Sequence, residues 1–583
     1  MKLITAFVFF TLFTIQAQVL PLERRVDWSV AGIRDTTTAG FTLLDAVAEG
    51  LFNDGTTPCD YPFGSLMLNH HEPIIIYFPP GEYLFNATIP LRSNMVLRGS
   101  GATNTKFIID NNGTGNGIDI HGWSSSNDTT KILNNIVKND SVLHGLNTNM
   151  LQVGDWVQLI QDDADLVTSS WALKSVGQIA RIAAINQQTI QLDASIRMDF
   201  PILRNPYIKK IIPVSNVGIE CISFERIDNC APEQASTIHF DYAVNCWVNG
   251  IESNKTTFAH IEASHSSNLS VTHSYFHHAF DYGGGGRAYG VMWHFTTNEC
   301  LVYSNSFEHL RHSMIVQAGA NGNVFAYNRS VDPFWTEGLF FPSNSAGDMV
   351  LHGNYPFANL FEQNDGQNMV IDNSHGANGP FNTFFRNRGS LFGIFFSDNT
   401  SPSQNFIGNE IPNTGTPYSL VNYTIQGNDQ FQYGNNNKGT IIPAGTVNLS
   451  DSSYYLTTQP INIPGGFYAS IGTPNAMNSG SIPATYYLST GNYFAKSCGY
   501  SSDLSIDESK KEDFVVYPNP TQPGKQLTVV GNWQQLFWMD ISGRVLEENV
   551  KTQTLIVPNL APGVYQLLIL TESGWRNEVV VVE

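Results

Sequence analysis

The chain has 583 residues, of which 42% are apolar, so it can fill a sizeable core, and disorder as its main state is excluded. Thirty Lys and Arg residues stand against fifty Asp and Glu residues, which gives a formal net charge of −20. This balance argues against nucleic acid and against an anionic membrane as partners, because both require concentrated positive charge.

The first residues have the pattern of a secretory signal peptide. A charged start at Lys2 precedes an apolar run that ends at Ile15, and the small residue Ala17 offers a cleavage point. The run is too short to span a bilayer stably, and no later segment is apolar enough to do so. We expect residues 1–17 to be removed, no transmembrane segment, and a protein that is secreted or attached to the cell surface.

The segment after this leader resembles a known family. Residues 75–83 (IIYFPPGEY), 93–99 (SNMVLRG) and 101–103 (GAT) are similar to the opening coils of the secreted pectate-lyase superfamily. The resemblance implies an all-β fold, a right-handed parallel β-helix of the pectin-lyase-like kind. Its N-terminal coils are assigned to residues 18–135.

Residues 136–212 interrupt the coil pattern. Residues 151–159 and 188–193 alternate apolar and polar side chains, which is typical of half-exposed strands. We predict an inserted antiparallel β-subdomain here. The acidic cluster between these strands suits a solvated loop better than a calcium site, so no cofactor is identified and calcium is left open. The cluster consists of Asp162, Asp163 and Asp165.

The six cysteines show no CxxC pairing. Their number and spacing indicate neither a zinc site nor a disulfide scaffold. One or two disulfide bonds are compatible with the sequence, for example Cys230–Cys246.

The middle of the chain repeats one strand template, a polar residue followed by four mostly strand-forming residues and Asn. Copies begin at Cys300, Asn323, Asn359 and Asn382, which are 23, 36 and 23 residues apart. A period in the low twenties predicts stacked coils, and residues 213–500 are assigned to the main β-helix and its C-terminal cap. The closing asparagines are expected to lie in line along one axis: Asn305, Asn328, Asn364 and Asn387.

Residues 274–294 hold four consecutive glycines among histidines, tyrosines and an arginine. The template strand before them begins at Asn268 and the next at Cys300, 32 residues later, which is longer than one coil requires. We interpret the glycine segment as an enlarged turn that folds back over a strand face and forms one wall of a groove.

Alignment of the coils places polar side chains in two columns. His277 and His309 take the same place in successive turns, and Arg311 follows directly. The second column contains His294, Gln317 and Asp372, which share one strand face because side chains alternate along a strand.

Two groups of residues follow as site predictions. Cationic and imidazole side chains suit a β-elimination, in which one group neutralises a carboxylate and another removes a proton. The predicted catalytic residues are Arg311, His312, His277 and Arg287. The predicted substrate-binding residues are Tyr289, His294, Gln317, Trp335, Glu337, Asp372 and His375.

The C-terminal end of the coil region leads to a linker and then to a second domain. Residues 501–513 are polar and without period, as in a linker, and residues 514–583 read as a small β-sandwich. Residues 516–520 (VYPNP) and 560–565 (LAPGVY) resemble the C-terminal sorting domain of the type IX secretion system of Bacteroidetes. This resemblance implies the type IX secretion machinery as a partner.

Three functions compete. A polysaccharide lyase acting on a uronic-acid-containing glycan is favoured. A glycoside hydrolase on the same fold needs two carboxyl groups about 5 to 9.5 Å apart, and a non-catalytic glycan-binding adhesin is the third reading. The carboxyl groups considered for hydrolysis are Glu337, Asp372, Asp281 and Glu362. In each case the partner is a polysaccharide, and we expect a monomer.

Overall fold

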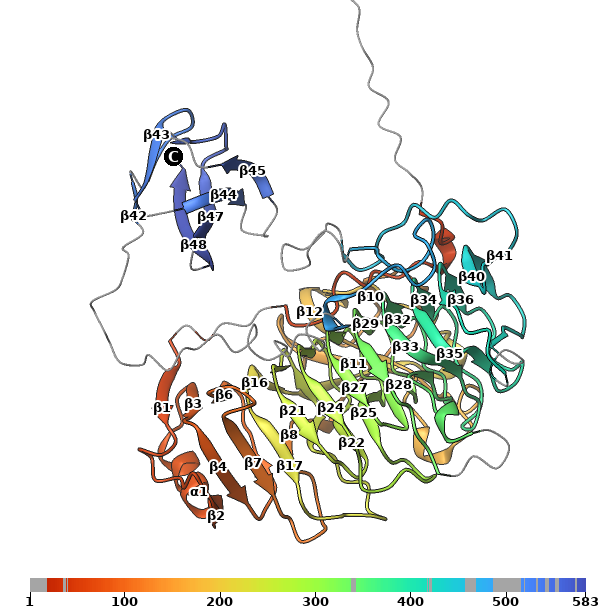
Figure 1. Ribbon diagram of the computed structural model, residues 1–583, viewed down its shortest axis with the longest axis horizontal. Helices are drawn as coiled ribbons and strands as arrows, with labels where there is room; N and C mark the ends of the chain where they lie inside the picture. Colours follow the sequence, from red (N-terminus) through yellow and green to blue (C-terminus); the bar gives the residue numbers. More distant parts are fainter. Residues whose placement is uncertain are drawn as a thin grey trace, which may run out of the picture. The chain divides into compact units, whose positions relative to one another are not determined.

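The computed structural model is built around stacked coils of short β-strands (Figure 1). It describes residues 18–34, 38, 40–336, 342–416, 418, 422–456, 468–485, 515–517, 520–530, 533–539, 545–550, 555–571 and 574–582. Successive coils pair their strands in parallel, so the chain is a right-handed parallel β-helix, as predicted from the sequence. The predicted signal peptide, the linker 501–513 and Glu337 lie outside the described residues.

The coils supply three rows of strands. The first sheet consists of β1 (Thr42–Asp45), β3 (Ile74–Phe78), β6 (Met95–Gly99), β16 (Val217–Glu220), β20 (Trp247–Asn249), β23 (Ser270–Thr272), β26 (Leu301–Tyr303), β29 (Val324–Ala326), β32 (Leu360–Glu362), β34 (Thr383–Phe385), β36 (Asn405–Ile407) and β39 (Phe431–Tyr433). The second row consists of β2 (Asp54–Pro58), β4 (Gly81–Phe85), β7 (Thr105–Ile109), β17 (Ser223–Arg226), β21 (Glu252–Asn254), β24 (Tyr275–His277), β27 (Ser306–Glu308), β30 (Arg329–Val331), β33 (Asp365–Ile371), β35 (Arg388–Phe396), β37 (Glu410–Ile411), β40 (Asn435–Asn437) and β41 (Thr440–Ile442).

The third row consists of β5 (Ile89–Pro90), β8 (Ile118–His121), β18 (Ile238–Asp241), β22 (Ala259–Ser264), β25 (Tyr289–His294), β28 (His312–Val316), β31 (Met349–Leu351), again β33 and β35, and β38 (Tyr423–Thr424). The long strands β33 and β35 pair with both rows, so the second and third rows merge into one sheet there. Shorter elements are β15 (Val214–Ser215), β19 (Ala243–Val244), α1 (Asp60–Asn69) and the 3-10 turns η1 (Leu22–Arg24), η2 (Ser170–Ala172), η3 (Ile202–Arg204) and η4 (Ser343–Ser345).

The inside of the coils is filled by apolar side chains that stack from one strand to the next. In the third row, Val291, Met314 and Met349 are in register and buried in the same core. In the first sheet, Phe325 stacks on Phe361 at a ring distance of 4.8 Å. Burial of one such side chain contributes about 1.5 to 3 kcal/mol, and the repetition of this contact is what joins the coils.

Buried asparagines form a ladder along one edge of the first sheet. The Asn328 side-chain oxygen accepts the backbone N–H of Asn305 at 3.0 Å, and Asn364 and Asn387 repeat this contact in the following coils. The ladder continues through Asn409. The predicted alignment of these asparagines is therefore confirmed, and each bond satisfies a backbone N–H that the turn would leave buried and unpaired.

The predicted antiparallel subdomain is a six-stranded sheet with the order β10, β13, β12, β11, β14, β9. Its strands are β9 (Trp123–Lys131), β10 (Val142–His144), β11 (Trp156–Ile160), β12 (Gln178–Asn186), β13 (Thr189–Leu192) and β14 (Tyr207–Ile212). The antiparallel pairing of β9 with β14 extends the sheet to residues before 136. All of its pairings are antiparallel, in contrast to the coils.

The inserted sheet is fixed to the turns that follow the third-row strands. The Asn298 side chain accepts the backbone N–H of Ile179 at 2.8 Å and donates to its carbonyl at 3.0 Å. The buried carboxylate of Glu299 pairs with Arg197 of the insert. These contacts hold the insert beside the third row, where it forms a wall of the site described below.

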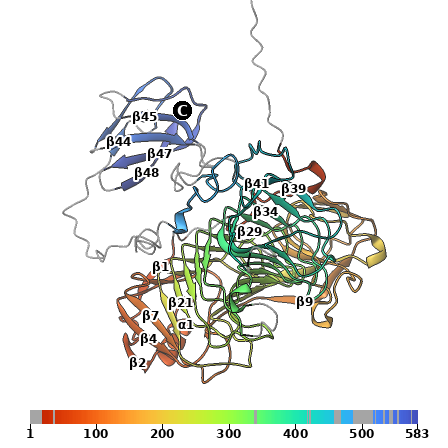
Figure 2. The same ribbon diagram turned by 45° about the vertical axis from the view of Figure 1, so that its right-hand side comes forward.

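The C-terminal unit, residues 501–583, is a separate compact body. Its described strands form two antiparallel sheets, a three-stranded one from β42 (Val515–Tyr517), β43 (Gln526–Val530) and β46 (Leu555–Ile556), and a four-stranded one. The latter has the order β45 (Val545–Val550), β44 (Trp533–Met539), β47 (Gly563–Thr571), β48 (Gly574–Val582), as Figure 2 shows. A core that includes Leu536, Trp538 and Leu567 gives this unit its own stability, as expected for a small β-sandwich.

Two further features bear on the sequence predictions. Cys230 and Cys246 are buried free thiols, so the suggested bond between them is wrong. Cys246 packs in the apolar core as a small hydrophobe, whereas the Cys230 sulfur accepts a hydrogen bond from Arg226 at 2.6 Å. No transmembrane segment was expected from the sequence, and among the described residues no helix is long and apolar enough to cross a membrane.

Candidate functional site

The site lies on the outer face of the third row, where polar side chains replace apolar ones. Ser264 and His294 are in register on β22 and β25. Gln317, His352 and Asp372 each follow the last paired residue of the next three strands and extend this row. The register agrees with the predicted alignment of His294, Gln317 and Asp372, with one additional strand between the last two.

The additional strand is β31, which the 36-residue spacing conceals. Its residues Met349-Val-Leu-His352 repeat the pattern Met314-Ile-Val-Gln317 of β28. Taking the long spacing as one enlarged coil omits this copy, and with it His352. The repeated apolar triplet followed by a polar residue is the signal that would have revealed it.

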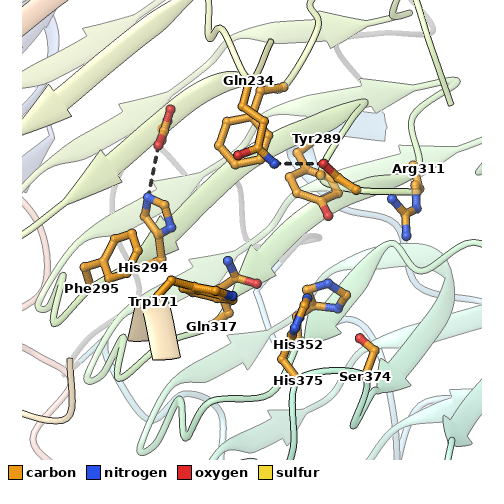
Figure 3. Close-up of a pocket in the computed structure, with 14 residues that line it drawn as sticks. Trp171, Gln234, Tyr289, His294, Phe295, Arg311, Gln317, His352, Ser374 and His375 are labelled. Carbon is orange, nitrogen blue, oxygen red and sulfur yellow. Dashed lines mark hydrogen bonds and ion pairs between the residues drawn. The ribbon is translucent and has the colours of Figure 1, made fainter. Parts of the chain in front are cut away.

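The first cavity has a volume of about 570 Å³ and lies over β22, β25, β28 and β31. Its floor is the polar row, and its walls come from the insert on one side and from the enlarged turn on the other. In Figure 3, Trp171 and Arg311 lie on opposite sides, with His352 and His375 between them. The lining residues are Trp171, Gln234, Phe258, Glu262, Gly285, Gly286, Tyr289, His294, Phe295, Arg311, Gln317, His352, Ser374 and His375.

The second cavity adjoins the first and has a volume of about 410 Å³. Arg311 and Ser374 line both cavities, so the two form one groove with these residues at the junction. The other lining residues are His312, Trp335, Ser345, Ala346, Gly347, Val370, Asp372, Phe392, Phe395 and Ser397.

Arg311 is the cation of the groove. Its Nη1 donates to the carbonyl of Gly283 at 2.9 Å, which ties it to the enlarged turn, and its guanidinium lies 5.9 Å from the centre of the Tyr289 ring. Its Nε is buried and has no hydrogen-bond partner. Arg311 therefore keeps one buried donor unsatisfied at the junction.

His312 and Tyr289 lie directly beside Arg311. They are in register on β28 and β25, and their rings stack at 5.2 Å. Burial lowers the pKa of His312 well below its ordinary value, and the nearby charges of Arg311 and His352 act in the same direction. Burial raises the pKa of Tyr289. At neutral pH the groove thus holds a neutral imidazole next to a protonated phenol.

The hydrogen bonds of His312 show which of its ring nitrogens has no partner. Nδ1 lies 3.4 Å from the carbonyl of Gly347, to which it donates, whereas Nε2 is buried without a partner. A neutral imidazole with its proton on Nδ1 carries the free electron pair on Nε2. His312 is therefore suited to accept a proton.

Glu262 and His294 form a buried pair at the insert end of the first cavity. His294 Nε2 lies 3.1 Å from Glu262 Oε1, and Ser236 donates to the other carboxylate oxygen at 2.6 Å. Burial lowers the pKa of His294. Burial alone would raise the pKa of Glu262, but the hydrogen bond from His294 and the charge of His239 lower it. Both directions describe a neutral imidazole that donates to a carboxylate and leaves Nδ1 unpartnered in the cavity wall.

His352 and Asp372 form a second acid–imidazole pair near the junction. Nδ1 of His352 lies 2.6 Å from Asp372 Oδ2. Burial opposes ionisation of Asp372, yet contact with His352 and Ser374 keeps its pKa below the ordinary value. The His375 ring lies 5.0 Å from that of His352, and burial lowers the pKa of His375. This arrangement orients His352 for hydrogen bonding to a ligand.

The aromatic wall is supplied jointly by the insert and the coils. Trp171 of η2 meets Phe295 at a ring distance of 5.8 Å and His375 at 5.4 Å, both edge to face. Nearly half of Trp171 is exposed. A partly exposed indole at a groove wall can stack on the apolar face of a sugar ring.

Most of the predicted site residues line the groove. Arg311, Tyr289, His294, Gln317 and His375 line the first cavity, and His312, Trp335 and Asp372 line the second. His277 and Arg287 do not. His277 pairs with Glu252 on the outer face of the second row, and Arg287 pairs with Asp281 within the enlarged turn.

Sequence reasoning missed seven polar or aromatic residues of the first cavity: Trp171, Gln234, Phe258, Glu262, Phe295, His352 and Ser374. Glu262 lies in β22, the third-row strand before that of His294, two residues before Ser264. Trp171 comes from the insert, whose docking position no repeat pattern reports. The coil register could have indicated Glu262, whereas Trp171 required the fold.

The carboxyl groups considered for hydrolysis are dispersed. Among the described residues that line either cavity, only Glu262 and Asp372 carry carboxylates. Glu262 is in register with Val370 through four successive strand pairings, which places the strand of Glu262 about 19 Å from the strand that ends before Asp372. Glu362 is fully buried and accepts the backbone N–H of Tyr454 at 2.8 Å.

The acidic cluster considered for calcium is engaged in internal contacts. Asp163 accepts the backbone N–H groups of Lys174 and Val176, and Asp165 pairs with Arg204. In the part of the chain that the structure describes, no group of three or more acidic, histidine or cysteine side chains is placed to hold a metal ion. The aspartates thus fix turns of the insert.

Comparison with known proteins places part of the chain near a described family. Residues 46–156 match the family model described as rhamnogalacturonase A/epimerase, pectate lyase-like. The comparison with curated proteins finds no match. The matched residues comprise the first coils and the beginning of the insert.

Several solved structures are similar over larger parts of the chain. The tailspike protein gp49 of Pseudomonas phage LKA1 has a TM-score of 0.48 at 12% identity over 64% of each chain, so the chain covers less than two thirds of that protein. The catalytic unit of the GH87 alpha-1,3-glucanase from Streptomyces thermodiastaticus strain HF3-3 has a TM-score of 0.33 at 10% identity, over 71% of this chain and 68% of the other. The surface adhesin PfbA of Streptococcus pneumoniae has a TM-score of 0.33 at 12% identity, over 64% of this chain and 85% of the other.

Proposed function

We propose that the protein is an exported polysaccharide lyase that cleaves a uronic-acid-containing glycan by β-elimination in the two-cavity groove. The observation that carries the proposal is the junction itself, where Arg311 with a free buried donor lies beside the neutral, buried His312. A uronate needs a cation at its carboxylate and a base at C5, and this junction offers both.

In the proposed reaction the sugar carboxylate pairs with Arg311, which withdraws charge and acidifies the proton at C5. His312 Nε2 takes that proton. The electron pair of the broken C5–H bond forms the C4–C5 double bond, and the bond from C4 to the glycosidic oxygen breaks. Tyr289 is protonated and can donate its hydroxyl proton to the leaving oxygen. The products are an unsaturated uronate end and a new hydroxyl end.

Hydrolysis is the second candidate, and the dispersed carboxylates count against it. Both mechanisms of glycoside hydrolysis place two carboxyl groups about 5 to 9.5 Å apart across the bond. The two described groove carboxylates come from strands that lie four strand spacings, about 19 Å, apart, and each is bound to its own histidine. A glycan-binding protein without activity would need neither the neutral base nor the protonated phenol.

Export is part of the proposal. The apolar leader that ends before residue 18 and the VYPNP and LAPGVY segments of the C-terminal unit support secretion through a type IX system, with the mature protein released or held at the cell surface. Deletion of residues 514–583 should leave the β-helix folded and retained inside the host envelope. Normal secretion of the truncated chain would contradict this part.

The activity is tested by incubating the mature protein with a panel of acidic and neutral polysaccharides. Ultraviolet absorbance from an unsaturated product on a uronate polymer is the expected result. New reducing ends without that absorbance would indicate hydrolysis, and retention on a polymer without cleavage would indicate an adhesin.

A further inference from the structure

The second cavity differs in chemistry from the first. Away from the junction, its surface is formed by Ala346, Val370, Phe392 and Phe395, with the Trp335 ring at its edge. Val370 and Phe395 are in register on β33 and β35, so these side chains form one apolar patch across two coils. The first cavity combines its aromatic side chains with histidines, two glutamine amides and Glu262.

The apolar patch continues a line of apolar side chains on the outer face of the third row. Met292, Ile315 and Val350 occupy the same register on the preceding strands, and Val370 packs at the end of this cluster. Beside the first cavity this row is buried against Phe258 and Tyr289 and does not line the cavity, whereas Val370 lines the second cavity itself. The groove floor therefore changes from polar to apolar at the junction.

The polar groups at this end of the second cavity are already bonded to the protein. The Trp335 indole N–H donates to Ser345 Oγ at 3.1 Å, and Ser345 donates to the carbonyl of Pro342 at 2.8 Å. The Ser397 hydroxyl donates to Asn373 Oδ1 at 2.9 Å. The unpartnered groups, His312 Nε2 and Arg311 Nε, belong to the junction.

These contacts decide which sugar fits. A sugar hydroxyl buried against Val370 and Phe395 would lose its water without gaining a partner, which is unfavourable. A methyl group in the same place removes apolar surface from water on both sides. The cavity thus discriminates between sugars by their substituents.

We propose that the second cavity is a subsite for a sugar residue that carries a short apolar substituent, a deoxy-sugar methyl or an O-acetyl group. This residue is the neighbour of the uronate whose carboxylate pairs with Arg311, and this placement rests on the proposed function. The substrate is then a heteropolymer or a partly acetylated polyuronate, with its plain hydroxyl-rich residues in the first cavity.

The test measures binding of the full mature chain to four matched pairs of immobilised polymers. One pair is an O-acetylated polyuronate before and after mild alkaline deacetylation, and a second is a polyuronate with and without 6-deoxyhexose units. The other two pairs repeat these comparisons on neutral polysaccharides. We expect the substituted member of at least one pair to bind about tenfold more tightly, the usual discrimination for one apolar group in a fitted pocket.

Val370→Thr and Phe395→Ser are the test variants, because each places a hydroxyl in the apolar patch. Val370→Thr keeps the side-chain shape and should reduce the preference for the substituted polymer about threefold or more. Gln317→Ala is the matched control, since Gln317 lines only the first cavity, and it should weaken both members of a pair equally.

The outcomes separate this inference from the proposed function. Tighter binding of the acetylated polymer identifies the O-acetyl group as the recognised substituent. Tighter binding of the deoxyhexose polymer identifies the methyl group, and either result supports the subsite. Preference confined to the neutral polymers keeps the subsite and overturns the uronate assignment. Equal binding of both members in every pair, or a preference that survives both Val370→Thr and Phe395→Ser, overturns the subsite.

Discussion

The outer faces of the second and third rows both carry histidines beside carboxylates, yet only one of them forms a groove. On the second row, His277 pairs with Glu252 at 3.1 Å and His309 with Asp332 at 2.6 Å, and neither histidine lines the cavities described here. On the third row, His294 and His312 are buried in a groove wall and each keeps one ring nitrogen without a partner.

The difference comes from what stands beside each row. The insert and the enlarged turn enclose the third row, so its histidines lose water and their pKa values fall through burial. The second-row histidines His277 and His309 line neither cavity and pair with the carboxylates of Glu252 and Asp332. A column of polar side chains on a β-helix therefore becomes a reaction site only where other parts of the chain exclude water from it.

The first prediction tests the comparison at its strongest point. Arg311→Ala and His312→Ala should each lower kcat by about 10² to 10⁴, because His312 accepts the C5 proton and Arg311 stabilises the charge that develops at the carboxylate. His277→Ala is the matched control on the second row and should change kcat less than about threefold. Steady-state kinetics on the polymer identified in the panel measure all three, with circular dichroism to verify folding.

A loss of activity in His277→Ala equal to that in His312→Ala would remove the distinction between the two rows. Near-normal activity in both groove variants would place the chemistry elsewhere.

The pH dependence of kcat should follow the burial of His312. Protonation removes the electron pair on Nε2, and the lowered pKa keeps the ring neutral to more acidic pH than an ordinary histidine. The groups that face it are Arg311, His352, Asp372 and Tyr289. We expect the acidic limb of the profile to lie below pH 6.5, and a limb above that value would contradict a buried base.

Trp171→Ala tests the wall that the insert supplies. Loss of one stacking ring should raise KM about threefold to tenfold with little change in kcat, because an aromatic contact contributes roughly 0.5 to 1.5 kcal/mol beyond its buried area. Trp123→Ala is a suitable control, since Trp123 is an exposed insert residue outside both cavities. Equal effects of the two substitutions would show that the wall does not contact substrate.

Glu362→Gln should leave activity unchanged and alter stability. Burial raises the pKa of Glu362 to about 7, against the hydrogen bonds from Ser453 and Tyr454. The pKa of Glu362 is higher in the folded protein than in the unfolded one, so protonation of this carboxyl stabilises the fold. This stabilisation is complete below pH 4.5 and is lost as the pH rises to about 7. The change amounts to about 3 kcal/mol. Urea unfolding at pH 5 and pH 8 should show this difference in the wild type and a smaller one in Glu362→Gln.

The coil architecture could be predicted from the sequence because it repeats. Asn305 and Asn328 lie 23 residues apart, a spacing that recurs between Asn364 and Asn387, and these asparagines form a hydrogen-bonded ladder. The position of His294 and Gln317 on one face follows from strand alternation alone. Contacts that repeat from coil to coil require the same residue types at regular spacings, and these spacings can be recognised in the sequence.

The walls of the groove could not be predicted in this way. The place of Trp171 depends on how the insert docks through Asn298 and Glu299, which are ordinary turn residues in the sequence. His277 and His312 are equally polar in the sequence, and only the tertiary structure separates the surface residue from the buried one. His352 was hidden because two strands share one long spacing.

The most direct test of the central claim is the mass of the products that the wild-type protein releases from a uronate polymer. Elimination predicts a new end that is an unsaturated uronate, lighter by one water than the hydrolysis product, and no solvent oxygen at C1 of the new reducing end. Saturated ends at the full hydrolysed mass, with solvent oxygen incorporated in ¹⁸O-labelled water at the cleaved bond, would contradict the assignment of Arg311 and His312 to β-elimination.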